Sequence, residues 1–123
     1  MIESYLLKLE RDLVGGVLHV MLLTQIDRSG PIHGYGVIKA LTESAGGRPL
    51  FKEGTIYPIL NELERVGVVR SEWGHGSAGP QRKYYSLTPL GRQTLKIAQQ
   101  EWVRVRVTMD TILNGNGKRS GTK

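Results

Sequence analysis

The sequence predicts a mainly α-helical fold with one β-hairpin, in the order α-α-α-β-β-α. Three segments before Gly67 place apolar residues every three or four positions, which is the period of a helix packed on one face. From Val68 onward the period changes to two, as in paired strands. A last segment with helical spacing follows Thr88. At 123 residues, the pattern fits one small domain, and a second subunit often completes a core of this size.

The first two helices are expected over residues 10–28 and 33–45. The first has a wide apolar arc and should be buried on two sides; the arc consists of Val14, Val17, Leu18, Met21, Leu22 and Ile26. It ends at the Ser-Gly-Pro turn of residues 29–31, because glycine and proline interrupt helices. The second helix ends at the glycine pair 46–47.

The third helix begins near Glu53 and ends at Gly67. Its apolar stripe consists of Ile56, Ile59, Leu60 and Leu63. Pro58 is tolerated if Thr55 is the N-cap, because proline then lies in the first turn, where its missing N–H has no partner to lose. If the helix begins earlier, the proline ring crowds the carbonyl of Gly54.

Two alternating segments, 68–73 and 84–87, predict a β-hairpin whose long tip, 74–81, is rich in glycine. Thr88 then caps the last helix, 88–113, with Pro89 at the first helical position. The apolar residues of this helix form a continuous seam, namely Leu95, Ala98, Trp102, Val105, Met109 and Ile112. A seam of this length requires a partner helix, so we expect a homodimer.

Composition narrows the class of protein. The chain has no cysteine, which excludes disulfide frameworks, cysteine-type zinc fingers and thiol nucleophiles, and favours the cytoplasm. The longest apolar run near the N-terminus, 20–23, is too short to cross a membrane. The net charge of +6 is compatible with a polyanionic partner, and by charge alone that partner could be DNA, RNA or a membrane surface. Half of that charge lies in the last ten residues, 114–123, which we expect to form a flexible basic tail.

This order of elements is the layout of a winged helix-turn-helix, with residues 10–87 as the DNA-binding domain and 88–113 as a C-terminal dimerisation helix. The second and third helices would read double-stranded DNA, and the hairpin would be the wing. The exposed face of the third helix offers Thr55, Tyr57 and Asn61, whose amide can pair with adenine. The glutamates at 62 and 64 would repel phosphate, so only the first half of that helix should approach DNA. The cations of the wing are Arg82 and Lys83.

Three sequence motifs then point to a known family. They are HGYGVI at 33–38, GTIYPIL at 54–60 followed by Leu63-Glu64, and GPQRKYYSLT at 79–88 followed by Gly91. In this order and spacing, the motifs resemble the PadR family of bacterial and archaeal transcriptional regulators over roughly residues 10–113. Two departures concern the helix opening, where Lys52-Glu53 replaces the common Ser-Pro, and the C-terminal region, where one helix replaces the larger helical domain of longer members.

The resemblance implies a homodimeric repressor that binds a palindromic operator and leaves it when a small-molecule effector binds. It places five residues at the DNA surface, namely Tyr35, Thr55, Tyr57, Arg82 and Lys83. A single C-terminal helix indicates the short subfamily, in which the first and last helices build the dimer. Effectors of the family include phenolic acids and planar hydrophobic drugs. No cofactor is implied.

Trp102 lies in the middle of the C-terminal seam, where a two-fold axis would bring two copies together. It would act first as a large apolar anchor between subunits. Two facing indoles would also leave a flat slot for a planar aromatic effector. The walls of this slot would be Val105, Met109, Val14 and Leu18, with Met109 adapting to different guests.

Other classes of protein fit less well. Some winged helices serve purely as protein-interaction modules and do not bind DNA, but that use predicts no cationic wing. Residues 74–79 fit G-x-G-x-x-G, yet Pro80 and a strand follow where a dinucleotide-binding helix should begin. The three histidines lie on different elements without the spacing of metal ligands, and no paired carboxylates or nucleophile motif indicate an enzyme.

Overall fold

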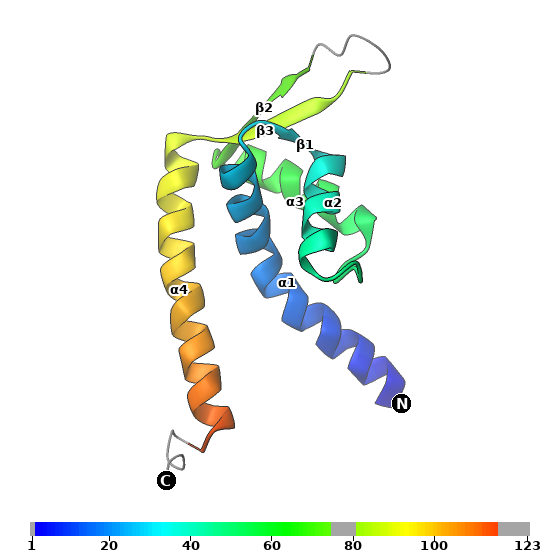
Figure 1. The fold of residues 1–123 in the computed structure, drawn as a ribbon, viewed down its shortest axis with the longest axis vertical. Helices are drawn as coiled ribbons and strands as arrows, with labels where there is room; N and C mark the ends of the chain where they lie inside the picture. Colours follow the sequence, from blue (N-terminus) through cyan, green and yellow to red (C-terminus); the bar gives the residue numbers. More distant parts are fainter. Residues whose placement is uncertain (1, 75–80, 116–123) are drawn as a thin grey trace.

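The computed structural model describes residues 2–74 and 81–115, and it confirms the mainly helical fold with a β-hairpin wing (Figure 1). The elements are α1 (Ile2–Ser29), β1 (Ile32–His33), α2 (Gly34–Ser44), α3 (Glu53–Arg65), β2 (Val69–Trp73), β3 (Lys83–Leu87) and α4 (Pro89–Leu113). The strands form an antiparallel sheet in the order β1-β3-β2. The wing projects from one end of the molecule, and α1 and α4 extend toward the other. The tip, 75–80, and the basic tail from 116 onward lie outside the described residues.

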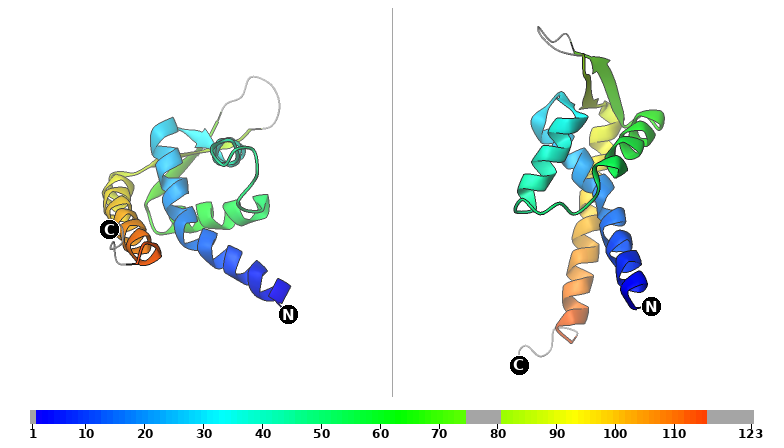
Figure 2. Two further views of the ribbon diagram at one scale, coloured as in Figure 1. Left: turned by 60° about the horizontal axis from the view of Figure 1, so that its bottom comes forward. Right: turned by 90° about the vertical axis from the view of Figure 1, so that its right-hand side faces the viewer.

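Helix α1 is longer than the sequence analysis predicted, because it begins at Ile2 and not at residue 10. Its first half contains no glycine or proline before Gly15, so nothing interrupts the helix there. The apolar side chains of that half are exposed, including those of Tyr5, Leu6 and Leu9. Figure 2 shows this half extending beyond the rest of the protomer. These residues therefore add no packed face to the protomer's own core.

The core lies where the second half of α1 meets α2, α3 and the sheet. Its most deeply buried side chains are Leu18, Leu22, Ile26, Val37, Ile56, Leu60 and Val69. Tyr85 and Leu87 of β3 cover this core from the sheet, while the neighbouring Tyr84 is only half-buried. This division, with one tyrosine facing inward and the other nearer the surface, follows from the alternation of side chains along a strand.

Helix α3 begins at Glu53, so Thr55 lies inside its first turn and is not the N-cap. Of the two alternatives for Pro58, the earlier start of the helix is the one observed. Lys52 occupies the cap position and makes no side-chain capping bond. Pro58 then lies beyond the first turn, where it has no N–H to offer the carbonyl of Gly54. The exposed side of α3 faces water at this point, so solvent can satisfy that carbonyl.

The C-terminal end of α3 is fixed by Gly67, whose φ of 87° lies in the left-handed region. The N–H of Val68 donates to the carbonyl of Leu63, and the N–H of Gly67 donates to that of Glu64. This pair of bonds is a Schellman motif, which turns the chain directly into β2.

Helix α4 is attached at this same turn. The Thr88 hydroxyl accepts from the N–H of Gly91 at 3.0 Å and donates to the Gly67 carbonyl at 2.6 Å. The N–H of Thr88 also donates to the carbonyl of Val68. The predicted cap at Thr88 and the N-terminal Pro89 are thus confirmed. Beyond Leu95, α4 runs beside the second half of α1 and then leaves the core, so no residue from 101 to 113 is buried (Figure 2).

Candidate nucleic-acid interface

The predicted reading residues of α3 lie on its exposed face. Ile56, Leu60 and Leu63 face the core, so helical spacing turns Thr55, Tyr57 and Asn61 outward, and all three side chains are exposed. Farther along α3, the guanidinium of Arg65 makes two bonds to the carboxylate of Glu62, at 3.0 and 2.6 Å. Arg65 is therefore already engaged within the helix, which leaves the first half of α3 as its available polar surface.

Tyr57 joins α3 to the start of α2. A Cβ atom on Gly34 would lie 2.5 Å from Cε1 of the Tyr57 ring, so only glycine allows the ring to lie this close. Tyr35, the next residue, is 54% exposed at the beginning of α2. The glycine of the HGY motif thus brings the two predicted DNA-contacting tyrosines onto neighbouring parts of one surface.

Arg82 and Lys83 have different surroundings, because consecutive residues of a strand point to opposite faces. Lys83 points toward α3, where its ammonium lies 3.3 Å from the carboxylate of Glu64. The Ser71 hydroxyl donates to that carboxylate at 2.5 Å. This bond from Ser71 lowers the pKa of Glu64, against the opposing effect of burial, and Lys83 lowers it further. Glu64 therefore balances the charge of Lys83. On the other side of the wing, Arg70 is paired with Glu72 at 3.3 Å, whereas Arg82 lies beside His33.

His33 is central to this surface, although the sequence analysis gave it no role. Its Nδ1 caps α2 by accepting the N–H of Gly36 at 2.9 Å. Its Nε2 lies 3.1 Å from Nη1 of Arg82. The imidazole also stacks on Tyr35 and meets the Tyr84 ring edge-on. Histidine at the position before a helix was the available signal, but its contact with the wing depends on the pairing of His33 with Tyr84.

Acidification should destabilise the protein through His33. Burial, and secondarily the charge of Arg82, lower the pKa of His33 below 6.5. The unfolded chain therefore binds the proton first, so the unfolding free energy falls as the pH drops below about 6.5 and through the lower folded-state pKa. Urea unfolding at pH 7.5 and at pH 5 checks this. His33→Asn should lose less stability on acidification than the wild type, and an equal loss would show that His33 does not contribute.

The residues predicted to line an effector slot do not share one environment. Trp102 and Val105 are 42% and 50% exposed on α4, and Met109 is similarly exposed one turn farther on. Val14 of α1 is half-buried, packed against the edge of the core. Leu18 is 1% exposed and belongs to the core of the protomer. In a single protomer, α4 therefore supplies the exposed part of this group.

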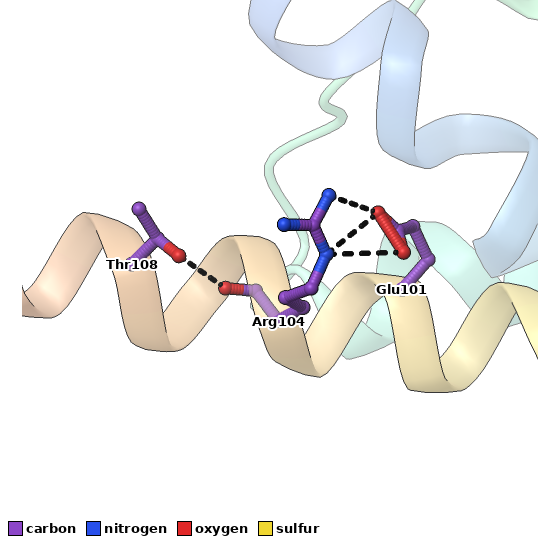
Figure 3. A network of polar contacts seen from close by, with 3 residues as sticks. All are labelled: Glu101, Arg104 and Thr108. Atoms are coloured by element: carbon purple, nitrogen blue, oxygen red, sulfur yellow. Dashed lines mark hydrogen bonds and ion pairs between the residues drawn. The ribbon is translucent and has the colours of Figure 1, made fainter.

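A polar stripe also runs along α4, where Glu101, Arg104 and Thr108 are joined by hydrogen bonds (Figure 3). Nε and Nη2 of Arg104 bond to the Glu101 carboxylate, and Thr108 donates to the Arg104 carbonyl at 2.8 Å. These three residues form a stripe next to that of Trp102, Val105 and Met109, because Val105 lies about one helical turn from both Glu101 and Thr108. The apolar stripe and the polar stripe together make the exposed part of α4 amphipathic.

The described ranges, 2–74 and 81–115, contain neither a membrane-spanning helix nor a metal-binding cluster. No helix there is both long enough and apolar enough to cross a bilayer. No group of three or more histidine, aspartate and glutamate side chains in these ranges is arranged to hold a metal ion.

Comparison with known proteins agrees with this arrangement. A PadR family transcriptional regulator from Eggerthella lenta is 30% identical, with a TM-score of 0.70 and 91% of each chain covered. A PadR-like transcriptional regulator from Bacillus cereus is 28% identical, with a TM-score of 0.72 over 83% of this chain and 96% of the other. An uncharacterized protein of Lysinibacillus sphaericus is 30% identical over 107 residues, covering 85% of this chain and 94% of its own.

The model of the transcriptional regulator PadR-like family matches residues 22–97. These residues contain the last two turns of α1, the helix-turn-helix, the whole sheet and the start of α4. The match therefore includes the Tyr57–Gly34 contact, the wing and the attachment of α4 at Gly91. The chain belongs to the PadR-like family of transcriptional regulators.

Proposed function

We propose that this protein is a repressor that binds a palindromic operator as a homodimer and releases it when a small-molecule effector binds. The observation that carries the DNA-binding part is the continuity of one surface. Tyr57 of α3 lies against the start of α2, and His33 at the start of α2 lies beside Arg82 of the wing, with 3.1 Å between Nε2 and Nη1. A recognition helix with a cationic wing beside it can contact base edges and phosphates together. Such a protein acts in the cytoplasm, where bacterial and archaeal DNA lies.

The homodimer part of the proposal rests on two exposed apolar surfaces. One lies on the first half of α1 and consists of Ile2, Tyr5, Leu6, Leu9 and Leu13; the other lies on α4 and consists of Trp102, Val105, Met109 and Ile112. Contiguous apolar surface of this kind is unusual on a monomer and typical of subunit contacts. Two-fold symmetry would place two recognition helices on half-sites about one helical turn, ~34 Å, apart.

Sequencing of genomic DNA fragments retained by the purified protein tests this function. We expect an inverted repeat, with two chains bound per site, because one recognition helix and one wing make too few contacts for specific binding. Fragments without an inverted repeat, bound by one chain each, would contradict the proposal. Retention of no DNA above background in low salt would instead favour a protein-interaction module.

Substitutions in the wing and in α3 should have different effects. Arg82→Ala should weaken binding to every sequence and reduce the salt slope by about one unit, because it removes one phosphate contact. Asn61→Ala should reduce the binding free energy for the operator by ~1 to 3 kcal/mol and relax the sequence preference at one base position only. Lys83→Ala should affect the slope less than Arg82→Ala, because Glu64 balances Lys83. Fluorescence anisotropy on operator and random duplexes measures all three. Equal losses on both duplexes for Asn61→Ala would contradict a reading role.

The effector part of the proposal places a flat slot between the Trp102 side chains of two protomers. The exposure of Trp102, Val105 and Met109 in one protomer supports it, because these side chains can contact a guest once two α4 helices face each other. Val14 and Leu18 would support the slot from α1. Planar aromatic or phenolic molecules are the expected guests, since aromatic stacking buries area without requiring hydrogen bonds.

A planar cationic dye should quench Trp102 and weaken operator binding over the same concentration range. Trp73 of the wing is also exposed, so Trp73→Phe is the background for the titration. In that background, Trp102→Ala should remove the quenching and leave a folded dimer. Unchanged dye binding without Trp102 would contradict the slot. Loss of the dimer would assign Trp102 to the subunit contact alone.

A further inference from the structure

The hydrogen-bond partner of Nδ1 fixes the protonation of His33. A backbone amide can only donate, so Nδ1, which receives the N–H of Gly36 at 2.9 Å, must carry a lone pair. A neutral imidazole has one N–H group, and in His33 that group is therefore on Nε2. Protonation of Nδ1 would break the cap of α2, so the structure requires the neutral ring.

The guanidinium of Arg82 cannot donate a hydrogen bond to His33, because the ring atom that it approaches is itself a donor. Its Nη1 lies 3.1 Å from Nε2, yet a guanidinium can only donate, and Nε2 already carries a proton. Two donors thus face the same space, and neither satisfies the other. Both lie on the outer side of the sheet, because His33 pairs with Tyr84 while Arg82 and Tyr84 alternate with Lys83.

The groups around this pair of donors favour an anion. The acidic residue nearest in the strand register is Glu72, opposite Tyr84, and its carboxylate is engaged by Arg70 at 3.3 Å. The beginning of α2 adds the partial positive charge of a helix N-terminus. Tyr35, stacked on His33 and largely exposed, has a phenol hydroxyl as a further donor.

We propose that His33 and Arg82 together bind one phosphate oxygen of the DNA backbone, with His33 as a neutral donor and Arg82 as the cation. An oxygen at the third corner of a triangle with these two nitrogens, which lie 3.1 Å apart, can be within hydrogen-bond distance of both. The inference rests on the proposed DNA binding and adds a specific contact to it. The shared phosphate would tie the wing to the start of α2, and so fix the angle between the wing and the recognition helix.

Salt dependence separates the two donors. Arg82→Gln should weaken binding to operator and random duplexes alike and lower the salt slope by about one unit. His33→Asn should weaken binding to both duplexes ~5- to 10-fold without changing the slope, because a neutral donor releases no counterion. Asparagine is a favoured N-cap, so its side-chain oxygen can still accept the N–H of Gly36. In the double variant the losses should be smaller than the product of the two single losses.

His19→Asn is the matched control, because His19 is an exposed histidine on α1 outside the sheet. The affinity of this variant for both duplexes should equal that of the wild type. Wild-type affinity for His33→Asn, with the Arg82 effect intact, would overturn the shared phosphate and leave the proposed function standing. Absence of DNA binding by the wild type would overturn both. An equal reduction of the salt slope by both single variants would also contradict a neutral His33.

Nitrogen NMR of the wild-type imidazole gives a test that needs no variant. The His33 ring should show the Nε2–H tautomer at neutral pH, and a duplex should shift the Nε2 signal at micromolar concentration. Inorganic phosphate at ~10 mM should leave the signal in place, since one oxygen without the rest of the duplex contributes little affinity. A shift by phosphate alone would assign a free-anion site and contradict the DNA assignment, as would the Nδ1–H tautomer.

Discussion

Val105→Glu is expected to separate the protomers and to lower operator affinity by about a thousandfold, toward the level of non-specific binding. Val105 is 50% exposed in the protomer and lies in the middle of the apolar stripe of α4, so the substitution leaves the protomer's core intact. In a dimer built on this stripe, the new carboxylate would be buried without a partner, which costs several kcal/mol in each subunit. Each protomer would then meet only one half-site.

Gln100→Glu is the matched control, because it adds the same charge on the side of α4 opposite Val105, and Gln100 is exposed. It should remain dimeric and keep most of its operator affinity. Sedimentation at ~1 to 10 μM and anisotropy on the selected operator measure both properties, and circular dichroism confirms that each variant is folded. A dimeric Val105→Glu would contradict the α4 contact. A monomeric variant with full operator affinity would contradict binding as a dimer.

Most of the elements that were predicted correctly have an apolar period that faces the protomer's own core. α2, α3 and the hairpin have this property. α4 has it only up to Leu95, and the rest of that helix was predicted from its continuous apolar seam, although this seam is exposed in the protomer. The first half of α1 was missed, although its exposed apolar side chains, among them Leu6, Leu9 and Leu13, also recur with helical spacing. β1 was missed because two residues cannot show a period.

The candidate site was predicted only in part, because several of its properties arise from contacts between distant segments. The exposed face of α3 follows directly from its apolar stripe. The pairing of Lys83 with Glu64 and the approach of Arg82 to His33 depend on how the sheet lies against α2 and α3. Strand alternation alone could have indicated that Arg82 and Lys83 point to opposite faces of the wing. The roles of Gly34 and Gly91 need three-dimensional neighbours, because a missing side chain leaves no signal of what approaches it.

Gly91→Ala is expected to destabilise the protein by about 2 to 4 kcal/mol, although alanine is the better helix former. A Cβ atom at Gly91 would overlap the carbonyl oxygen of Val68, which is backbone and cannot rotate away. The start of α4 must then move, and the bonds from Thr88 to Gly67 and to Val68 weaken with it. The gain in helix propensity, at most about 1 kcal/mol, is too small to offset this. Thermal unfolding at one fixed protomer concentration should show a loss of roughly 10 °C.

Gly54→Ala provides the matched comparison, because Gly54 is also helical, and a Cβ atom there would meet nothing within 4 Å. That variant should be as stable as the wild type or up to about 1 kcal/mol more stable. Equal stability of the two alanine variants would show that α4 can shift freely at Val68. The expected result has a consequence for function, because α4 carries the proposed subunit contact and Gly91 fixes the direction in which it leaves the DNA-binding domain. At temperatures where Gly91→Ala is still folded, its operator affinity should therefore fall more than its affinity for a single half-site.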